Sequence, residues 1–323
     1  MIALLYCLVG LGALIIGAEL LVRGGARLAA AMRIPPMIIG LTLVSIGTSF
    51  PELAVGIEAS LCGSGSLAVG NIAGTNTVNI LLILGLSALM TPLSIELRTL
   101  RLDLPAMIIA AVALQVLAMD GVLTRLDGAL MIAGGIGFTV LLIRSAWRRR
   151  RAVRESAEDV VAMSAPATPR YILQNLALLV VGIVVIVAGA DWLVEGSIDL
   201  ARIFGVSESF IGLTVVAIGT SSPELVTTIV ATLRRDRDIA IGNLIGSSVY
   251  NIAFILGVTL LVPADGLAVE PGLIAIDIPV MVAVAVVCVP VFVGGRRVSR
   301  LEGGLFVAAY LAYLTLLTLT RSG

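Results

Sequence analysis

The chain has 323 residues, of which 59% are apolar and 13% charged, and its mean hydropathy is +1.11. Soluble domains carry about 45–50% apolar and about 25% charged residues, so this composition excludes a soluble globular protein. The 21 basic residues, all arginine, balance 21 acidic residues, and the chain contains no histidine or lysine. Histidine acid–base chemistry, histidine metal ligation and lysine Schiff bases are therefore excluded.

Ten apolar segments divide the chain, each close to the roughly 20 residues that a helix needs to cross the hydrocarbon core. No basic residue precedes Arg23, so we expect the first segment to be a retained span rather than a signal peptide. Residues 147–169 are charged and then rich in Ser, Ala and Pro, which predicts a linker between five-helix halves at 1–146 and 170–323. The predicted spans are 2–30, 36–61, 67–90, 103–119, 128–146, 171–201, 208–233, 239–262, 273–294 and 303–320.

The arginines concentrate in alternate loops. If the N-terminus lies outside, the outer side holds only Arg125, Arg202 and Arg321, whereas every inner loop carries arginine. The positive-inside rule then predicts that both termini lie outside and that linker 147–169 is cytoplasmic. We therefore expect an integral protein of a prokaryotic plasma (inner) membrane.

An internal repeat relates the two halves at an offset of 172 residues. GLTLVSIGTSFPEL at 40–53 aligns with GLTVVAIGTSSPEL at 212–225, and GNIAGTNTVNILLILG at 70–85 aligns with GNLIGSSVYNIAFILG at 242–257. The matches include Gly, Pro, Glu and Asn, which apolar composition alone does not supply. Because each half has an odd number of spans, the second half enters the membrane in the opposite sense. Inverted repeats place a transporter's binding site near the bilayer midplane.

Each copy of the repeat places one glutamate, Glu52 or Glu224, in the middle of an apolar span. A carboxylate at that depth costs about 2.5–3.5 kcal/mol on insertion scales and indicates a functional position. Pro51 and Pro223 precede the two glutamates and each removes a helical hydrogen bond. We therefore expect helix breaks at the Gly-Thr-Ser triplet before each proline, with backbone oxygens that a cation satisfies.

The two GN-x-x-G segments add amides and hydroxyls. Thr75 and Asn79 are four residues apart and share one helix face, as do Ser247 and Asn251. We expect Asn79 and Asn251 to line the site, whereas helix–helix contact fits the first asparagine of each segment better. The glycines of these segments permit close helix approach.

The predicted ligands are all oxygen atoms, from carboxylates, hydroxyls, amides and backbone carbonyls. Ca²⁺ takes six to eight oxygens, whereas zinc, copper and iron prefer His or Cys. The three cysteines, Cys7, Cys62 and Cys288, lie far apart in the sequence. One Ca²⁺, two Na⁺ or two protons neutralise two glutamates, and competition for the same pair is a basis for exchange.

The motif pairs GTSFPE with GNIAGTNTVN and GTSSPE with GNLIGSSVYN resemble the repeats of the calcium/cation antiporter superfamily, in particular prokaryotic sodium/calcium exchangers. The resemblance covers essentially the whole chain and implies an all-α fold of ten helices in two inverted repeats that works by alternating access. It implies that Glu52 and Glu224 bind Ca²⁺ with Thr48 and Thr220. It implies further ligands at Ser45 and Ala217, through their carbonyls, and at Ser49, Ser221, Thr75, Ser247, Asn79 and Asn251.

We therefore expect Na⁺-driven Ca²⁺ antiport, with Ca²⁺ and Na⁺ as substrates and no cofactor, nucleic acid or obligate protein partner. The alternative is exchange of Ca²⁺ or another divalent cation for protons by the same glutamates. Proton-coupled members of the superfamily typically carry a glutamate where this chain has Gly74 and Gly246, which favours Na⁺. Asn251 stands where K⁺-dependent members carry aspartate, which argues against K⁺ co-transport. An intramembrane enzyme would need a nucleophile with a base, or a catalytic metal, and we expect neither.

Two further acid pairs occupy corresponding positions in the halves. Asp103 and Asp277 each lie two residues before a proline, which predicts that they cap helix starts. Glu19 and Asp191 align at the repeat offset, and either pairing with arginine or lining an access path fits them.

Overall fold

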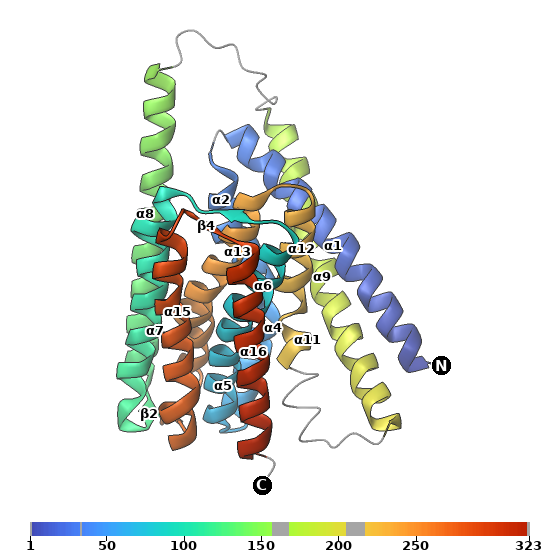
Figure 1. Ribbon diagram of the computed structural model, residues 1–323, viewed down its shortest axis with the longest axis vertical. Helices are drawn as coiled ribbons and strands as arrows, with labels where there is room; N and C mark the ends of the chain where they lie inside the picture. The colour runs from blue at the N-terminus through green and yellow to red at the C-terminus, as the bar shows by residue number, and fades with distance from the viewer. Residues whose placement is uncertain (1, 33, 157–167, 205–216, 322–323) are drawn as a thin grey trace.

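The computed structural model describes residues 2–32, 34–156, 168–204 and 217–321, which form a bundle of apolar helices (Figure 1). The α-helices are α1 (Ile2–Met32), α2 (Pro36–Ile39), α3 (Ser45–Thr48), α4 (Phe50–Leu61), α5 (Gly65–Thr77), α6 (Gly85–Met90), α7 (Leu104–Leu117), α8 (Arg125–Ser156), α9 (Pro169–Ile203), α11 (Ala217–Thr220), α12 (Ser222–Leu233), α13 (Arg237–Tyr250), α14 (Gly257–Leu261), α15 (Ile278–Val293) and α16 (Arg300–Arg321).

Nine of the ten predicted spans have a counterpart among the described residues. Eight helices there are long and apolar enough to cross a membrane, and the bent pair Pro36–Thr48 and Phe50–Leu61 makes a ninth. The remaining predicted span, 208–233, lies partly outside the described residues, which include its second part as α11 and α12. Helix α8 runs through Ser156, into the predicted linker, because the Arg-rich sequence there favours helix.

Wide π-helical turns interrupt the helices at corresponding positions of the two halves. The single inserted residue of a π-turn often marks a functional site, and both Asn79 and Asn251 lie in such turns. The π-helices are η1 (Gly40–Val44), η2 (Val78–Leu84), η3 (Thr99–Asp103), η6 (Asn251–Leu256) and η7 (Leu273–Asp277), and η4 (Ala118–Asp120) is a 3₁₀ turn.

The predicted helix breaks are confirmed in both halves. Helix α3 ends at Thr48 and α4 begins at Phe50, while α11 ends at Thr220 and α12 begins at Ser222. At the first break the chain bends by 42°. Each proline occupies the first turn of the helix that follows, where its missing N–H leaves no bond unmade. The two glutamates therefore lie in the first turns of new helices.

Helices α1 and α9 lie side by side along their length (Figure 1). Glycines recur every seventh residue on both contact faces. A Cβ on Gly17 would lie 2.7 Å from the backbone nitrogen of Ile186, and one on Gly182 would lie 2.7 Å from that of Leu21. Small residues let membrane helices approach closely enough for backbone contact. The glycines on these faces are Gly10, Gly17, Gly24, Gly182, Gly189 and Gly196.

Two short antiparallel strand pairs connect loops of the first half to loops of the second. Strand β1 (Leu93–Ser94) pairs with β4 (Arg297–Val298), and β2 (Val122–Leu123) pairs with β3 (Leu267–Ala268). The pairs lie at opposite ends of the bundle (Figure 1). Two-residue strands are too short for an alternating pattern to reveal them, so the all-α expectation omitted them.

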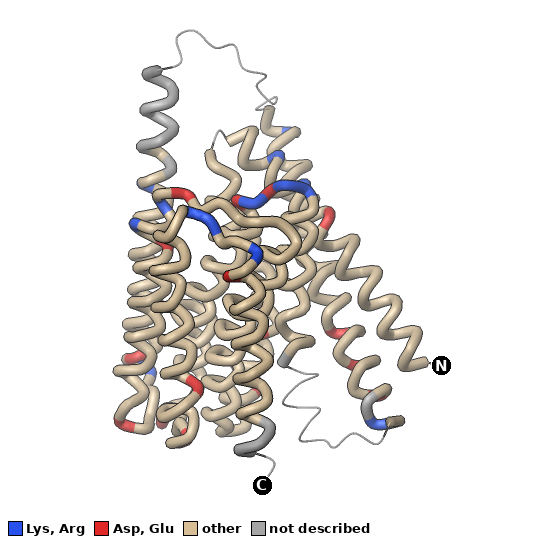
Figure 2. Tube along the Cα trace, in the orientation of Figure 1, with Lys and Arg blue, Asp and Glu red and all other residues tan. Residues whose placement is uncertain are grey.

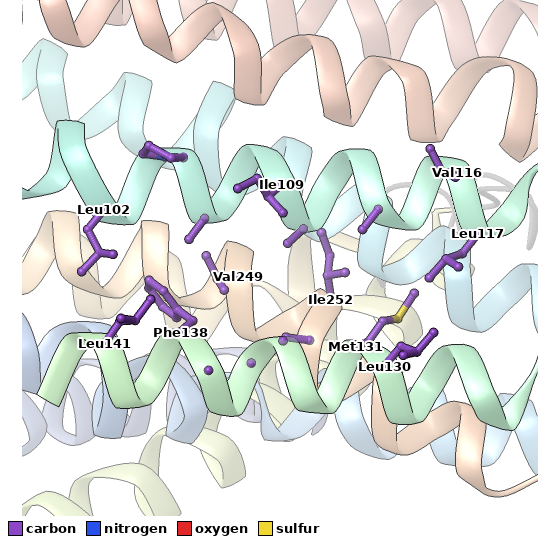
Figure 3. A pocket seen from close by; sticks show the side chains of 18 of the residues that line it. Leu102, Ile109, Val116, Leu117, Leu130, Met131, Phe138, Leu141, Val249 and Ile252 are labelled. Atoms are coloured by element: carbon purple, nitrogen blue, oxygen red, sulfur yellow. The ribbon is translucent and has the colours of Figure 1, made fainter. Parts of the chain in front are cut away.

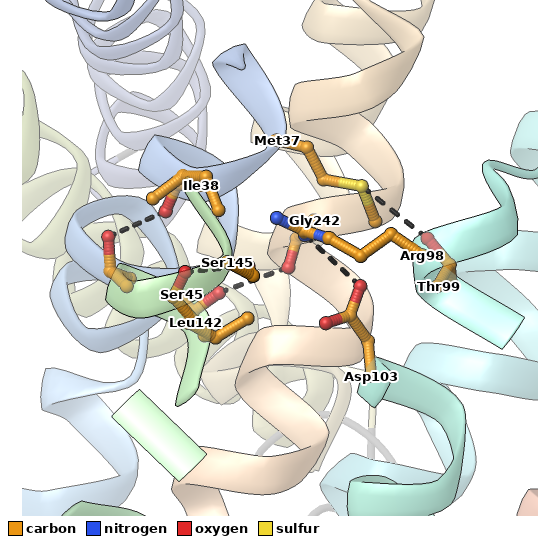
Figure 4. Close-up of polar contacts among 10 residues, drawn as sticks. Met37, Ile38, Ser45, Arg98, Thr99, Asp103, Leu142, Ser145 and Gly242 are labelled. Carbon is orange, nitrogen blue, oxygen red and sulfur yellow. Dashed lines mark hydrogen bonds and ion pairs between the residues drawn. The ribbon is translucent and has the colours of Figure 1, made fainter. Parts of the chain in front are cut away.

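The predicted capping role of Asp103 and Asp277 is wrong. Both residues already have helical backbone angles, because η3 and η7 run directly into α7 and α15, whereas an N-cap residue is extended. The Oδ2 atom of Asp103 instead accepts from Nη2 of Arg98 at 3.1 Å, inside the bundle (Figure 4). Oδ1 of Asp277 accepts from the hydroxyl of Tyr313 at 2.7 Å.

The two acids on α1 and α9 differ in their surroundings. Glu19 forms ion pairs with Arg23, on its own helix, and with Arg234, in the turn after α12. Asp191 is exposed. Of the two roles that fitted these positions, the structure supports pairing with arginine for Glu19.

Close backbone contact of α13 with α2 and η1 depends on glycines. A Cβ on Gly246 would clash with the Ser45 hydroxyl and lie 2.7 Å from the carbonyl oxygen of Leu41, and one on Gly242 would lie 2.7 Å from that of Met37. Such contacts leave no room for a methyl group, because backbone atoms cannot move aside cheaply.

We expect Gly246→Ala to lower the stability of the protein by about 1–3 kcal/mol, the usual range for overpacking. Thermal unfolding of the purified protein in detergent measures this change. Gly12→Ala is the matched control, because apart from the adjacent backbone of α1 no atom of the described residues lies within 4 Å of a Cβ at Gly12. Equal unfolding temperatures for the two variants would contradict the packing described above.

Candidate functional site

Two buried glutamates form the centre of the site. Glu52 on α4 and Glu224 on α12 are both 0% exposed, and each lies in the first turn of its helix. The positive end of a helix dipole favours an anionic side chain there. The two carboxylates are close enough to repel each other. Among the ion pairs of the described residues, none involves either glutamate.

Hydroxyls from both halves surround Glu224. The Ser49 hydroxyl, at the break between α3 and α4, donates to Oε1 of Glu224 at 3.2 Å. The Ser247 hydroxyl on α13 donates to the same oxygen at 3.5 Å. Ser49 and Ser247, which lie in the repeated motifs of different halves, are therefore close to the same carboxylate.

The π-turns bring the predicted amides to the same region. Turn η2, which carries Asn79, packs against α12, and η6, which carries Asn251, packs against α4. Asn79 and Asn251 are 0% exposed. Each half therefore supplies an amide beside the helix that carries the other half's glutamate.

Many buried polar atoms of the site have no hydrogen-bond partner among the described residues. A buried polar atom without a partner costs about 1–3 kcal/mol, so several together indicate that something else satisfies them. Oxygen-rich clusters of this kind suit hard cations such as Ca²⁺. The atoms are Oε1 and Oε2 of Glu52, Oε2 of Glu224, Oδ1 and Nδ2 of Asn79, Oγ of Ser221 and Oδ1 of Asn251.

Asn243 holds Thr48 in place. The Thr48 hydroxyl lies beside Glu224, and its single proton can be donated either to Oδ1 of Asn243 or to the carbonyl oxygen of Ser45, each at 3.3 Å. Nδ2 of Asn243 donates to the Thr228 hydroxyl at 3.2 Å. Asn243 thus connects three elements, as the helix–helix alternative for this residue anticipated. Sequence reasoning missed Thr228, because its repeat counterpart is Gly56 and the comparison of the halves gave no signal there.

The Ser45 hydroxyl takes part in packing rather than in the carboxylate cluster. It lies 3.3 Å from the carbonyl oxygen of Gly242 (Figure 4). It also lies 2.6 Å from the carbonyl oxygen of Gly40 and 3.0 Å from that of Asn243. Because the hydroxyl of Ser45 is engaged in these contacts, the atom of Ser45 that is predicted to bind a cation is its carbonyl oxygen. That carbonyl accepts from the backbone nitrogen of Ser49 at 3.2 Å.

The other predicted ligands are distributed along the two broken helices and α5. Thr75 lies beside Glu52 and is 3% exposed, while Thr220 and Ser221 at the second break are 7% and 1% exposed. The backbone of Ala217 begins α11, and its side chain is outside the described part of the chain. The described residues thus bring Ser49, Ser247 and Thr48 to Glu224, and Thr75 to Glu52.

The donor chemistry of the site is that of a hard cation. Within the described ranges no group of three or more His, Cys, Asp or Glu side chains could hold a metal ion. Transition metals prefer the nitrogen of His and the sulfur of Cys, and the sequence contains no His. Two carboxylates surrounded by neutral oxygens instead suit Ca²⁺ or Na⁺.

A large groove outside the site has the wrong chemistry for cations. It encloses about 660 Å³ between α7 and α8, and Leu102, Ile109, Phe138 and Ile252 line it (Figure 3). Of the described residues that line it, Arg101 is charged and none is acidic. Its apolar walls suit hydrocarbon chains, so the buried carboxylates remain the candidate site.

The chain is similar along most of its length to a family model and to proteins of other organisms. A family model described as sodium/calcium exchanger protein matches residues 2–144 and 174–319. The sodium/calcium exchanger MaX1 of Methanosarcina acetivorans is 32% identical, and the alignment covers 97% of each chain. Inner membrane protein YrbG of Escherichia coli is 36% identical over 87% of this chain and 85% of that protein.

The fold agrees with these similarities. A solved structure of the sodium-calcium exchanger NCX_Mj matches with a TM-score of 0.82 at 26% identity, covering 99% of this chain and 98% of that chain. The resemblance stated from the paired motifs is therefore confirmed, and the expectation of an integral membrane transporter rather than an enzyme agrees with it. The chain belongs to the sodium/calcium exchanger family of membrane cation antiporters.

Proposed function

We propose that the protein exchanges Ca²⁺ for Na⁺ across a prokaryotic inner membrane, by alternating access at a site formed by Glu52 and Glu224. Ten spans in two inverted five-helix halves build the transporter. The observation that carries the proposal is the pair of buried carboxylates on broken helices, with no arginine partner among the described ion pairs and several unsatisfied oxygens around them. Transported cations supply the missing positive charge.

Exchange follows from the charge of the site. One Ca²⁺ or two Na⁺ neutralise the two carboxylates, so Ca²⁺ and Na⁺ exclude each other from the site. A loaded site has a net charge near zero, and the transporter can therefore switch between its two orientations at a lower cost than with two uncompensated charges inside the membrane. Ca²⁺ binds between the glutamates with Thr48 and Thr220. Na⁺ binds in flanking positions at Ser45, Ala217, Ser49, Ser221, Thr75 and Ser247, with Asn79 and Asn251 completing the centre.

Packing at Gly246 favours Na⁺ over protons as the coupling ion. A Cβ there would lie 2.7 Å from the carbonyl oxygen of Leu41, so no carboxylate fits at that position. The relatives MaX1 and NCX_Mj are named sodium/calcium exchangers. Proton-coupled exchange by the same glutamates is the alternative that the following experiment separates.

We expect ⁴⁵Ca²⁺ uptake into everted membrane vesicles to rise several-fold when an imposed Na⁺ gradient drives Na⁺ outward. Coupling through one shared pair of carboxylates makes this response necessary. An imposed pH gradient without Na⁺, and a K⁺ gradient, are the controls and should give no uptake above background. Uptake that follows the pH gradient and ignores Na⁺ would establish the proton-coupled alternative.

We expect Glu52→Gln and Glu224→Gln each to reduce Na⁺-driven ⁴⁵Ca²⁺ uptake at least about tenfold, because a charge-assisted contact contributes about 1.5–3 kcal/mol. Glu58→Gln is the matched control, since Glu58 lies on the same helix as Glu52 but is exposed. Size-exclusion profiles in detergent check that each variant folds. Normal uptake in either glutamate variant would remove that residue from the site.

We propose that both ends of the chain lie outside the cell. Figure 2 shows most arginines at the end of the bundle where α8 ends and α9 begins, and few at the end where α16 finishes. The positive-inside rule assigns the arginine-rich end to the cytoplasm.

We expect a reporter fused after Gly323 to be active if it requires an extracytoplasmic location and inactive if it requires the cytoplasm, because the arginine-rich end faces the cytoplasm. Alkaline phosphatase and green fluorescent protein fusions measure this. The same reporters inserted after Ser164, in the predicted linker, are the control and should give the opposite result. A fluorescent fusion after Gly323 would overturn the orientation.

A further inference from the structure

Asn76 contacts an amide of the site directly, although it is not one of the predicted ligands. Its Oδ1 atom accepts a hydrogen bond from Nδ2 of Asn251 at 3.2 Å. Its own Nδ2 atom donates to the backbone carbonyl of Ser248 at 3.1 Å. Asn76 is 4% exposed and Asn251 is 0% exposed, so both contacts are buried.

These two bonds fix the orientation of both amides. The carbonyl of Ser248 can only accept, so the NH₂ group of Asn76 must face it and the oxygen of Asn76 must face Asn251. Asn251 must therefore turn its own NH₂ group toward Asn76. Its oxygen then points the other way, and this buried oxygen has no hydrogen-bond partner within the described ranges.

With Asn76 in place, the space beside its side chain is small and mostly apolar. It measures about 10 Å³, and its walls include Ile80, Met107 and Met281. A cavity needs roughly 10–15 Å³ and two or more polar partners to hold one water molecule. Besides Asn251 and Ser248, the amide of Asn76 contacts only the sulfur of Met281 among the described residues, at 3.6 Å.

The corresponding amide of the first half lacks such a contact. Asn79 is the repeat counterpart of Asn251, and neither of its side-chain polar atoms has a hydrogen-bond partner within the described part of the chain. Ser248 is the repeat counterpart of Asn76, and its hydroxyl donates to the carbonyl of Leu244 on its own helix at 2.9 Å. The halves therefore differ: one site amide is held and the other is not.

We propose that Asn76 is a positioning residue that holds the Asn251 amide with its oxygen, rather than its NH₂ group, toward the transported cations. The proposal rests on the proposed cation site. An NH₂ group turned toward Ca²⁺ would present partial positive charge, so loss of the orientation weakens cation binding. Asn76 acts through Asn251 and needs no contact with the ion.

Equilibrium ⁴⁵Ca²⁺ binding to the purified protein in detergent tests this proposal. We expect Asn76→Ala and Asn251→Ala each to raise the Kd for Ca²⁺ roughly tenfold, as expected for one hydrogen-bonded ligand of a charged group. The double variant should bind no more weakly than Asn251→Ala alone, because Asn76 has no orientation to supply once the amide is gone. Multiplied effects in the double variant would show a separate packing role and overturn the proposal.

Two further variants separate orientation from packing. Asn76→Leu keeps the branched shape of the side chain but neither hydrogen bond, so we expect a Kd as weak as that of Asn76→Ala. A normal Kd for Asn76→Leu would overturn the proposal. Ser248→Ala is the matched control at the repeat position, and we expect its Kd to be unchanged because its hydroxyl bonds only within α13.

The binding readout keeps this proposal distinct from the proposed function. Wild-type protein that binds ⁴⁵Ca²⁺ but shows no Na⁺-driven uptake would contradict Na⁺ coupling and leave the role of Asn76 to be decided by the variants. Wild-type protein that binds no Ca²⁺ would overturn both.

Discussion

Two carboxylates that must be satisfied inside an apolar bundle constrain the rest of this structure. Glu52 and Glu224 are fully buried and close to each other. Charge in such surroundings is expensive unless it is paired, and no described arginine pairs with them. The helix breaks, the π-turns and the surrounding hydroxyls all turn neutral oxygens or helix N-termini toward this pair. In the proposed function, the transported cations supply this positive charge.

The backbone supplies this arrangement through a few residue types. Proline before each glutamate starts a new helix there, so each carboxylate lies at a positive helix end. Glycine lets α13 lie against η1 closely enough for Gly242 and Gly246 to meet backbone carbonyls. Seven-residue glycine spacing does the same between α1 and α9. Close backbone contact fixes the positions of the polar residues more narrowly than apolar side-chain packing alone would.

The features that depend on chain-wide hydrophobicity and on the repeat could be predicted from the sequence. Nine spans, both helix breaks and the convergence of Ser49 and Ser247 on Glu224 follow from such signals. The capping prediction for Asp103 failed because a π-turn continues through it, and π-turns have no sequence signal in a single chain. Thr228 and Asn76 were missed because their repeat counterparts, Gly56 and Ser248, are chemically different. Comparison of the two repeats identifies the residues that both halves share, and it gives no information about positions at which the halves differ.

The two strand pairs act as clamps at opposite ends of the bundle. Each clamp joins a loop of the first half to a loop of the second by backbone hydrogen bonds, through Leu93 with Val298 and Leu123 with Leu267. The helices next to these loops, α6 to α8 and α14 to α16, are thereby restrained from rotating against one another. Helices α1 and α9 contribute no strand, and their contact surface is lined with glycine. The fold thus combines a block that is joined at both ends by strand pairs with a helix pair whose two backbones pack directly against each other.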